Sequence, residues 1–206
     1  MACAICQTRR PRRACPGVGG EICSVCCGTE REVTVSCPLD CEYLQRARKR
    51  DPMPSIERGQ IPNLDMRMTQ SELREHEELL SFMAAAVLRA ALKIPGVVDL
   101  DVREALDAMA RTYRTLQSGI YYETRPENPL AAEICSFVQN ALEEFRKNET
   151  ERLGSTRTRD GDVLKILVFL QHFALDRNNG RQRGRAFVDA LRGFYPPPSA
   201  PSLILP

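Results

Sequence analysis

The apolar residues of this chain follow a helical period over most of its length. The clearest run has 4-3-4-3-4 spacing, which returns each apolar side chain to the same face of a helix. Asp101 and Glu104 suit the first turn of that helix, because acidic groups favour a helix N-terminus, and Arg125-Pro126 should end it. The expected inward face consists of Val102, Leu106, Met109, Tyr113, Leu116 and Ile120.

Capping signals bracket a helix on each side of this run. Residues 69–72 read Thr-Gln-Ser-Glu, a capping box, and the Pro-Gly pair at 95–96 ends the continuous helix that should follow. The Asn-Pro pair at 128–129 supplies an N-cap and a first helical residue, and Gly154 marks the stop. These signals predict one helix before the 101–125 helix and one after it.

The C-terminal part predicts two more helices. Residues 163–170 are apolar on nearly every side, so the helix at 162–177 should lie at the centre of the fold. An Asn-Asn-Gly stop follows at 178–180. A short fifth helix is expected over 182–194, and its inward residues should be Phe187, Leu191 and Phe194.

Together these patterns predict a mainly α fold with an all-α bundle of four to five helices over residues 64–195. Three prolines among residues 51–63 indicate a linker before the bundle. A triple proline opens residues 196–206 and predicts an extended, Pro-rich tail. Because the linker separates the two parts, we expect the bundle to fold without residues 1–50.

Residues 1–50 have few large apolar side chains and hold eight of the nine cysteines. Two pairs have C-x-x-C spacing, and such a turn is tight enough to aim both sulfurs at one tetrahedral ion. Eight thiolates suffice for two closed four-sulfur sites, so we expect two structural zinc ions in this Cys-rich module. The expected ligands are Cys3, Cys6, Cys15, Cys23, Cys26, Cys27, Cys37 and Cys41.

The neighbouring residues Cys26 and Cys27 rarely ligate one ion comfortably, so we assign them to different ions. The first cysteine set is then Cys3, Cys6, Cys23 and Cys26, and the second cysteine set is Cys15, Cys27, Cys37 and Cys41. A sequential pairing is the alternative, with Cys23, Cys26, Cys37 and Cys41 on one ion. An iron–sulfur cluster, a redox-active C-x-x-C and reduced cysteines without a metal also stay open.

The rest of the module predicts a short strand and one helix. Polar and β-branched residues alternate over 32–36, and Asp40 can cap a helix from Cys41 towards Arg50. A knuckle, a strand and a helix with the last ligands are typical of a treble-clef finger. The interleaved cysteine order resembles the cross-brace of HIT and MYND fingers, over residues 3–41 only. Those fingers usually end with a His and a Cys ligand, whereas no histidine precedes His76 here.

The net charge of +2 is unevenly distributed. Residues 1–50 carry nine Lys or Arg against five Asp or Glu, whereas residues 51–175 carry fifteen against twenty. The segment 177–185 is rich in arginine, whose guanidinium fork suits phosphate, and we identify it as a candidate anion-binding turn. Alternatively it is a solvated turn whose arginines pair with the acidic middle of the chain. The arginines are Arg177, Arg181, Arg183 and Arg185.

The remaining reactive side chains stand alone. We interpret His76 as solvated, His172 as a core histidine and Cys135 as an inert buried thiol, because no catalytic motif accompanies them. No run of eighteen apolar residues and no leader-like N-terminus occurs, so we expect a cytoplasmic protein without a membrane partner.

These observations favour a zinc-binding protein whose module is an interaction surface for protein or nucleic acid on a helical scaffold. Self-association through the helical domain is a further expectation. Two other classes stay open: an enzyme or small-ligand binder that uses a pocket in the helical domain, and a thiol redox sensor. A closed bundle core would argue against the pocket, and a sensor needs an exposed cysteine outside the metal shells.

Overall fold

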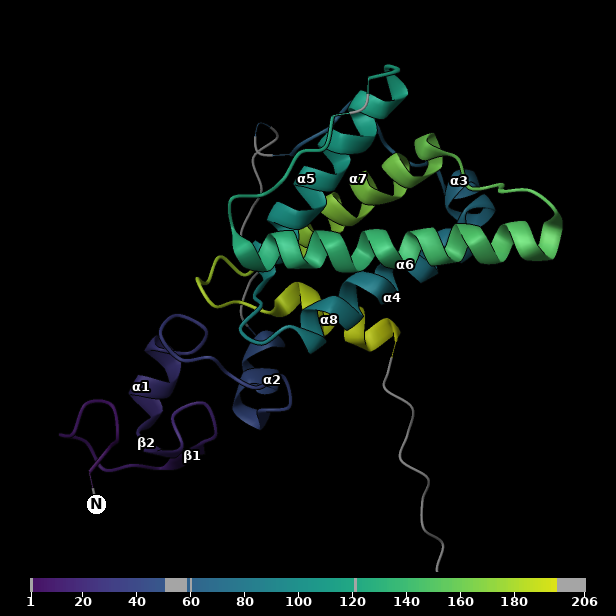
Figure 1. Ribbon diagram of the computed structural model, residues 1–206. Coiled ribbons are helices and arrows are strands. Elements are labelled where there is room, and N and C mark those ends of the chain that lie inside the picture. Colours follow the sequence, from purple (N-terminus) through teal and green to yellow (C-terminus); the bar gives the residue numbers. More distant parts are fainter. Residues whose placement is uncertain (1, 51–58, 60, 121, 196–206) are drawn as a thin grey trace, which may run out of the picture.

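The computed structural model describes residues 2–50, 59, 61–120 and 122–195 (Figure 1). A small module precedes a bundle of helices, which confirms the expected mainly α class. The module contains the strands β1 (Arg13–Cys15) and β2 (Gly20–Ile22) and the helices α1 (Ser24–Thr29) and α2 (Glu42–Arg48). The bundle contains α3 (Gln70–Glu75), α4 (Glu77–Lys93), α5 (Asp99–Gln117), α6 (Pro129–Leu153), α7 (Asp160–Asp176) and α8 (Ala186–Phe194). None of these helices combines the length and the apolar character needed to cross a bilayer.

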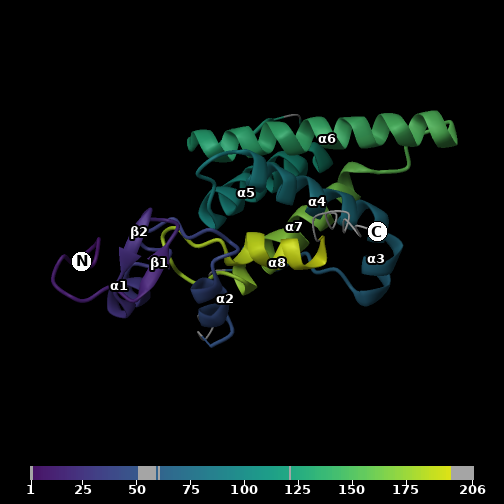
Figure 2. The same ribbon diagram turned by 90° about the horizontal axis from the view of Figure 1, so that it is seen from below.

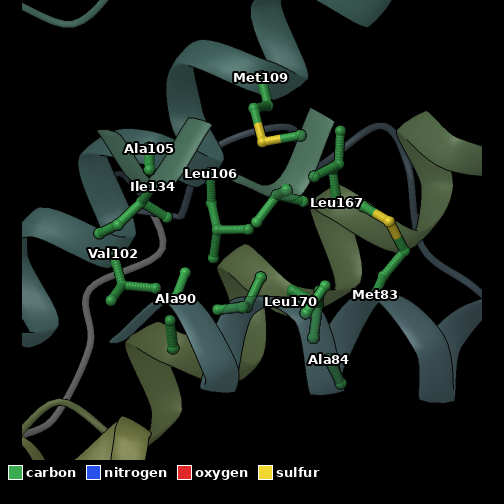
Figure 3. Close-up of a cluster of buried hydrophobic side chains, with 14 of the residues drawn as sticks. Met83, Ala84, Ala90, Val102, Ala105, Leu106, Met109, Ile134, Leu167 and Leu170 are labelled. Atoms are coloured by element: carbon green, nitrogen blue, oxygen red, sulfur yellow. The ribbon is translucent and has the colours of Figure 1, made fainter. Parts of the chain in front are cut away.

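Helix α7 lies at the centre of the bundle, as its apolar sequence predicts. Its residues Val163, Leu164 and Ile166 are fully buried, and its main neighbour is α5. Figure 2 shows α6 on one side of the bundle and α8 on the other, with α4, α5 and α7 between them. In Figure 3, Leu167 and Leu170 of α7 meet side chains from the three helices α4, α5 and α6. The bundle core is therefore a closed apolar layer.

The expected capping signals form as the sequence predicts. The Thr69 hydroxyl accepts the Glu72 N–H, and the Glu72 carboxylate accepts the Thr69 N–H at 2.9 Å. Asn128 accepts the N–H of Leu130 at 3.0 Å, and Pro129 occupies the first position of α6. At the other end of α6, Gly154 has a φ of 76°, a left-handed conformation that glycine adopts without steric cost.

The expected continuous helix from 69 to 94 is instead divided at His76, where φ is −105° and ψ is 20°. The His76 N–H still donates to the Glu72 carbonyl, and the Leu80 N–H donates to the His76 carbonyl. Because these hydrogen bonds cross the junction, the division is a one-residue kink between α3 and α4.

Helix α5 ends at Gln117, so the expectation that it continues to Arg125 is wrong. Gly119 has a φ of 77°, and its N–H donates to the carbonyl of Leu116. The Ile120 N–H reaches back to the Thr115 carbonyl, which completes a Schellman motif. The chain leaves the helix axis at this motif, and the Ile120 side chain is therefore 63% exposed and not part of the core.

Helix α8 begins at Ala186, four residues later than expected, because its first turn is capped from another helix. The Asp99 carboxylate of α5 accepts the N–H groups of Phe187 at 2.9 Å and Val188 at 3.1 Å. Phe187 and Leu191 are buried as expected, but Phe194 is 66% exposed at the end of the helix, which corrects its assignment to the core.

The module differs from expectation in its strands. The sheet is formed by β1 and β2, with Arg13 opposite Ile22 and Cys15 opposite Gly20. The segment 32–36 contributes only an isolated bridge between Arg31 and Val35. A φ of 53° at Glu32 explains this, because a left-handed residue cannot continue a strand.

The expected short helix at the end of the module is present as α2, but Asp40 does not cap it. Asp40 instead binds Arg192 of α8, with 2.6 Å between Oδ1 and Nη1. Leu39 is buried in the apolar cluster of the bundle, and Arg48 of α2 donates to Asp189 of α8 at 2.5 Å. The module is thus packed against the α8 side of the bundle. Independent folding of the bundle stays a prediction, and residues 51–58, 60 and 196–206 of the proposed linker and tail lie outside the described residues.

Asp99 gives the fold a pH dependence that can be measured. Its side chain is buried, and burial raises its pKa to about 6, from about 3.9 in an unfolded chain. The raised pKa means that the stabilising contribution of Asp99 is complete below about pH 4 and is lost as the pH rises through about 6. We expect the free energy of unfolding of the wild type, minus that of Asp99→Asn, to fall by about 2–3 kcal/mol between pH 4 and pH 7.

Denaturant unfolding of both proteins at the two pH values measures this difference. Groups that titrate alike in both proteins cancel, so an unchanged difference would show that Asp99 does not titrate in this range.

Candidate metal centre

The first cysteine set comes together in the module. Its four Sγ atoms all lie within 4.8 Å of one another, and Cys3, Cys23 and Cys26 are buried. A tetrahedral zinc site with Zn–S distances of about 2.3 Å places its sulfurs about 3.8 Å apart. The four sulfurs therefore surround a point at which such an ion fits.

Two local structures hold these sulfurs in place. Cys3 and Cys6 lie on the N-terminal turn, where the Gln7 N–H donates to the Cys3 carbonyl at 2.8 Å. Cys23 is the N-cap of α1, and its sulfur accepts the N–H of Cys26 at 3.4 Å. The Cys23 N–H in turn donates to the Cys3 sulfur at 3.2 Å. Backbone N–H groups aimed at sulfur stabilise the thiolate form that binds metals.

The environment of the four thiols favours a bound cation. Burial, together with the sulfurs of Cys23, Cys6 and Cys3, raises the pKa of Cys26 to about 12. Hydrogen bonds from Thr8 lower the pKa of Cys6 to about 5. The raised pKa of Cys26 reflects burial beside other sulfurs, and a bound cation would offset this cost of ionising its thiol.

Arg9 supplies positive charge directly beside the set. Its pKa is raised, chiefly because its guanidinium donates a hydrogen bond to the Cys23 sulfur. The positive charge of Arg9, in the arginine-rich loop between Cys6 and Cys15, would therefore offset part of the negative charge of the thiolates.

The second cysteine set lines a small cavity of about 20 Å³ next to the first. Cys15 ends β1, Cys27 lies in α1 and Cys41 is the N-cap of α2, so three elements meet at the cavity. Gly17 permits this approach, because a Cβ on it would lie 2.6 Å from the Ser36 carbonyl oxygen. Among the described residues, a grouping of ligand atoms within 4.8 Å occurs in the first set only.

The arrangement supports the interleaved assignment over the sequential one. Cys23 and Cys26 lie with Cys3 and Cys6, whereas Cys37 and Cys41 line the second cavity. Cys26 belongs to the first set and also lines the second cavity, next to Cys27, so the two sets are direct neighbours.

The arginine-rich turn 177–185 contacts the module. The Arg181 guanidinium donates to the Arg31 carbonyl at 2.6 Å, and that of Arg183 donates to the Ser36 hydroxyl at 2.7 Å. Arg185 donates to the Ala91 carbonyl of α4 at 3.2 Å, and Arg177 lies 5.2 Å from the Phe173 ring centroid. The turn therefore bridges the two parts of the chain, and anion binding by it stays a prediction.

Sequence reasoning missed Glu32, which is central to this contact. The residue is 1% exposed and accepts a hydrogen bond from Arg48 at 2.6 Å and another from Asn179 at 2.8 Å. The alternating pattern of residues 32–36 predicted only that Glu32 begins a short strand. No local signal identifies its partners, because Asn179 lies 147 positions away along the chain.

The other candidate side chains have structural partners. The half-buried His172 ring donates its N–H to the Pro62 carbonyl at 2.7 Å, at the edge of the core rather than inside it. The expectation that His76 is solvated is wrong, because its side chain is only 17% exposed and lies 3.7 Å from an oxygen of Asp162. Cys135 is buried, and burial raises its pKa to about 11, which keeps its thiol protonated and unreactive. These contacts agree with structural roles.

The helical domain carries an open groove of about 780 Å³ between α3, α6 and the start of α7. Its lining is strongly charged, but Lys165 and Glu72 already pair at 2.7 Å. The hydrogen bond from Lys165, together with that from the Thr69 N–H, lowers the pKa of Glu72 to about 2, so this carboxylate is ionised and caps α3. An enzyme or small-ligand site in the helical domain stays an alternative hypothesis.

Comparison with protein-family models, with curated proteins and with solved structures finds no match for this chain.

Single cysteine substitutions test which thiols hold metal. Cys6→Ser removes one ligand of the first set, and we expect the purified protein to lose one equivalent of metal, because three thiolates leave the site open. Cys135→Ser is the matched control, since that thiol lies in the bundle, and its metal content should equal that of the wild type. Elemental analysis measures both. Equal metal content in Cys6→Ser and wild type would contradict the assignment of the first set.

Proposed function

We propose that this chain is a cytoplasmic zinc-binding protein in which two structural zinc ions hold a small interaction module on a helical scaffold. The observation that carries the proposal is the convergence of the four sulfurs of the first cysteine set within 4.8 Å. Four thiolates complete a tetrahedral zinc shell and leave no position for a substrate, so this ion would be structural.

The small core of the module supports a structural role for the metal. Its buried cluster consists of Cys3, Ile22, Cys23 and Cys26, so three of its four members are cysteines. A chain segment of about fifty residues with so little apolar side chain needs a metal or disulfide to fold stably. Zinc bound to the thiolates would supply that stabilisation.

The second zinc ion is proposed on the second cysteine set. The four residues line one cavity. In this assignment the adjacent residues Cys26 and Cys27 of α1 each bind a different ion. The resulting interleaved ligand order supports the proposed likeness to treble-clef, cross-brace fingers. Zinc is preferred to an iron–sulfur cluster because the first set encloses a space suited to a single ion.

The proposed interaction surface is the basic face of the module. Arg9, Arg10 and Arg12 are exposed, and the neighbouring Arg13 lies 4.5 Å from the Tyr43 ring centroid of α2. This contact joins the basic loop to the helix that leads into Lys49 and Arg50. A nucleic acid or an acidic protein surface would complement this charge.

Metal analysis tests the core of the proposal. We expect two zinc ions per chain and no iron in protein purified without added metal, measured by elemental analysis against protein concentration. One ion per chain would remove the second site, and iron in place of zinc would replace the proposal with a cluster protein.

A binding titration tests the basic face. We expect duplex DNA or RNA to bind the wild type with an affinity that falls steeply with salt, because each neutralised phosphate releases a counterion. The double variant Arg10→Ala/Arg12→Ala should reduce the slope of log affinity against log salt by about 1–2. The double variant Arg152→Ala/Arg157→Ala removes the same charge from exposed positions on the bundle and is the control. Absence of binding at low salt would leave a protein as the partner.

A further inference from the structure

We propose that the second cysteine set makes the docking of the module on the bundle dependent on bound metal. The connection runs through one buried carboxylate and its partners, here called the Glu32 interface: Glu32, Arg48, Asn179, Arg183 and Arg185. The inference rests on the proposed function, because it requires an ion on the second cysteine set.

Glu32 holds the arginine-rich turn through both its side chain and its backbone. Its carboxylate accepts the Asn179 side-chain N–H at 2.8 Å and the Arg185 backbone N–H at 3.0 Å. Its carbonyl accepts the Arg183 backbone N–H at 2.8 Å. Three contacts of one residue therefore join the module to residues 179–185, and Arg48 of the module's own α2 holds the same carboxylate at 2.6 Å.

The conformation of Glu32 requires support from its surroundings. A buried carboxylate is costly unless it is paired and hydrogen-bonded, and the left-handed φ of 53° adds a steric cost for a residue with a Cβ. A residue in such a state persists only where the surrounding structure holds it, and such positions concentrate where structures switch.

The second cysteine set provides that support from both sides of Glu32. Cys27 and Cys37 bracket the nine-residue loop 28–36, so binding of both thiolates to one ion closes the loop that presents Glu32. Cys41 is the N-cap of α2, and α2 carries Arg48. The same four ligands therefore position the carboxylate and one of its cationic partners.

The bundle side of the interface is anchored separately. The Gly184 carbonyl accepts the Asp99 N–H of α5 at 2.8 Å, and Asp99 caps α8. In Figures 1 and 2 the yellow-green segment that precedes α8 lies against the module. Removal of the ion would relax the module side only, so the turn would lose Glu32 while the bundle helices stay folded.

Tryptic cleavage of the full-length protein reports this release, because trypsin cuts after arginine and the turn contains Arg181, Arg183 and Arg185. Mass spectrometry measures cleavage after these residues relative to cleavage after Arg157, an exposed site in the loop between α6 and α7. Chelation of the wild type should raise this ratio by about tenfold, because local opening governs cleavage. Far-ultraviolet circular dichroism should retain most of the helical signal.

The variant Glu32→Ala breaks the interface without touching a cysteine. It should raise the same ratio by about tenfold while the zinc content stays at two per chain. Chelation should then add little, because both changes release the same contact. Glu21→Ala is the control, since Glu21 is exposed on β2 and removes the same charge. Asn179→Ala removes one donor from the bundle side and should give a smaller increase.

The outcomes separate this inference from the proposed function. Two zinc ions per chain with an unchanged cleavage ratio after chelation would overturn the metal-dependent docking and leave the zinc sites standing. Equal increases on chelation in wild type and Glu32→Ala would also overturn it, because the two effects would then be independent. A metal content below two zinc ions per chain, with no ion on the second set, would contradict the proposed function. The metal-dependent docking would then be ruled out as well.

Discussion

The scarcity of apolar side chains in the module is the constraint on which the rest of this structure depends. Cys3, Cys23 and Cys26 occupy positions that leucine or valine fill in a larger domain. Sulfur atoms so close together gain little from packing as neutral thiols, but as thiolates around one ion they form strong, directional bonds. Under the proposed function, a coordination centre would replace the apolar core of the module, and the stability of the module would depend on metal supply and on the redox state of the thiols.

The junction between module and bundle is held mainly by charged side chains, unlike the apolar core of the bundle and the cysteine cluster of the module. Leu39 adds one apolar side chain to the bundle core, but the other described contacts are charged: Asp40 with Arg192, Arg48 with Asp189, and Glu32 with the turn 177–185. Charged interfaces contribute specificity more than net stability, because desolvation offsets much of the attraction. An interface of this kind suits two parts that separate and rejoin, and its arginines remain half-buried or exposed at the molecular surface.

Local signals predicted the helices well wherever a cap and an apolar stripe agreed. The capping box at Thr69, the Asn-Pro start of α6 and the glycine stop at Gly154 all form as expected. The predicted end of α5 was wrong because the apolar pattern continues beyond the helix stop at Ser118-Gly119. The predicted start of α8 was wrong because Asp99, from another helix, supplies its cap. Ile120 and Phe194 were assigned to the core because periodicity alone does not show where a helix ends.

The sequence by itself determined the helical class and the cysteine-rich module, and it limited the first cysteine set to two alternative pairings. These properties are local: thiolate spacing, capping residues and helical period act over a few residues and need no distant partner. The tertiary structure alone decided the role of Glu32, the docking of the arginine-rich turn and the capping of α8 by Asp99. Each of these depends on a charged side chain whose hydrogen-bond partner lies 88 to 153 positions away along the chain. Periodicity and spacing act over short distances in the sequence and do not predict such contacts.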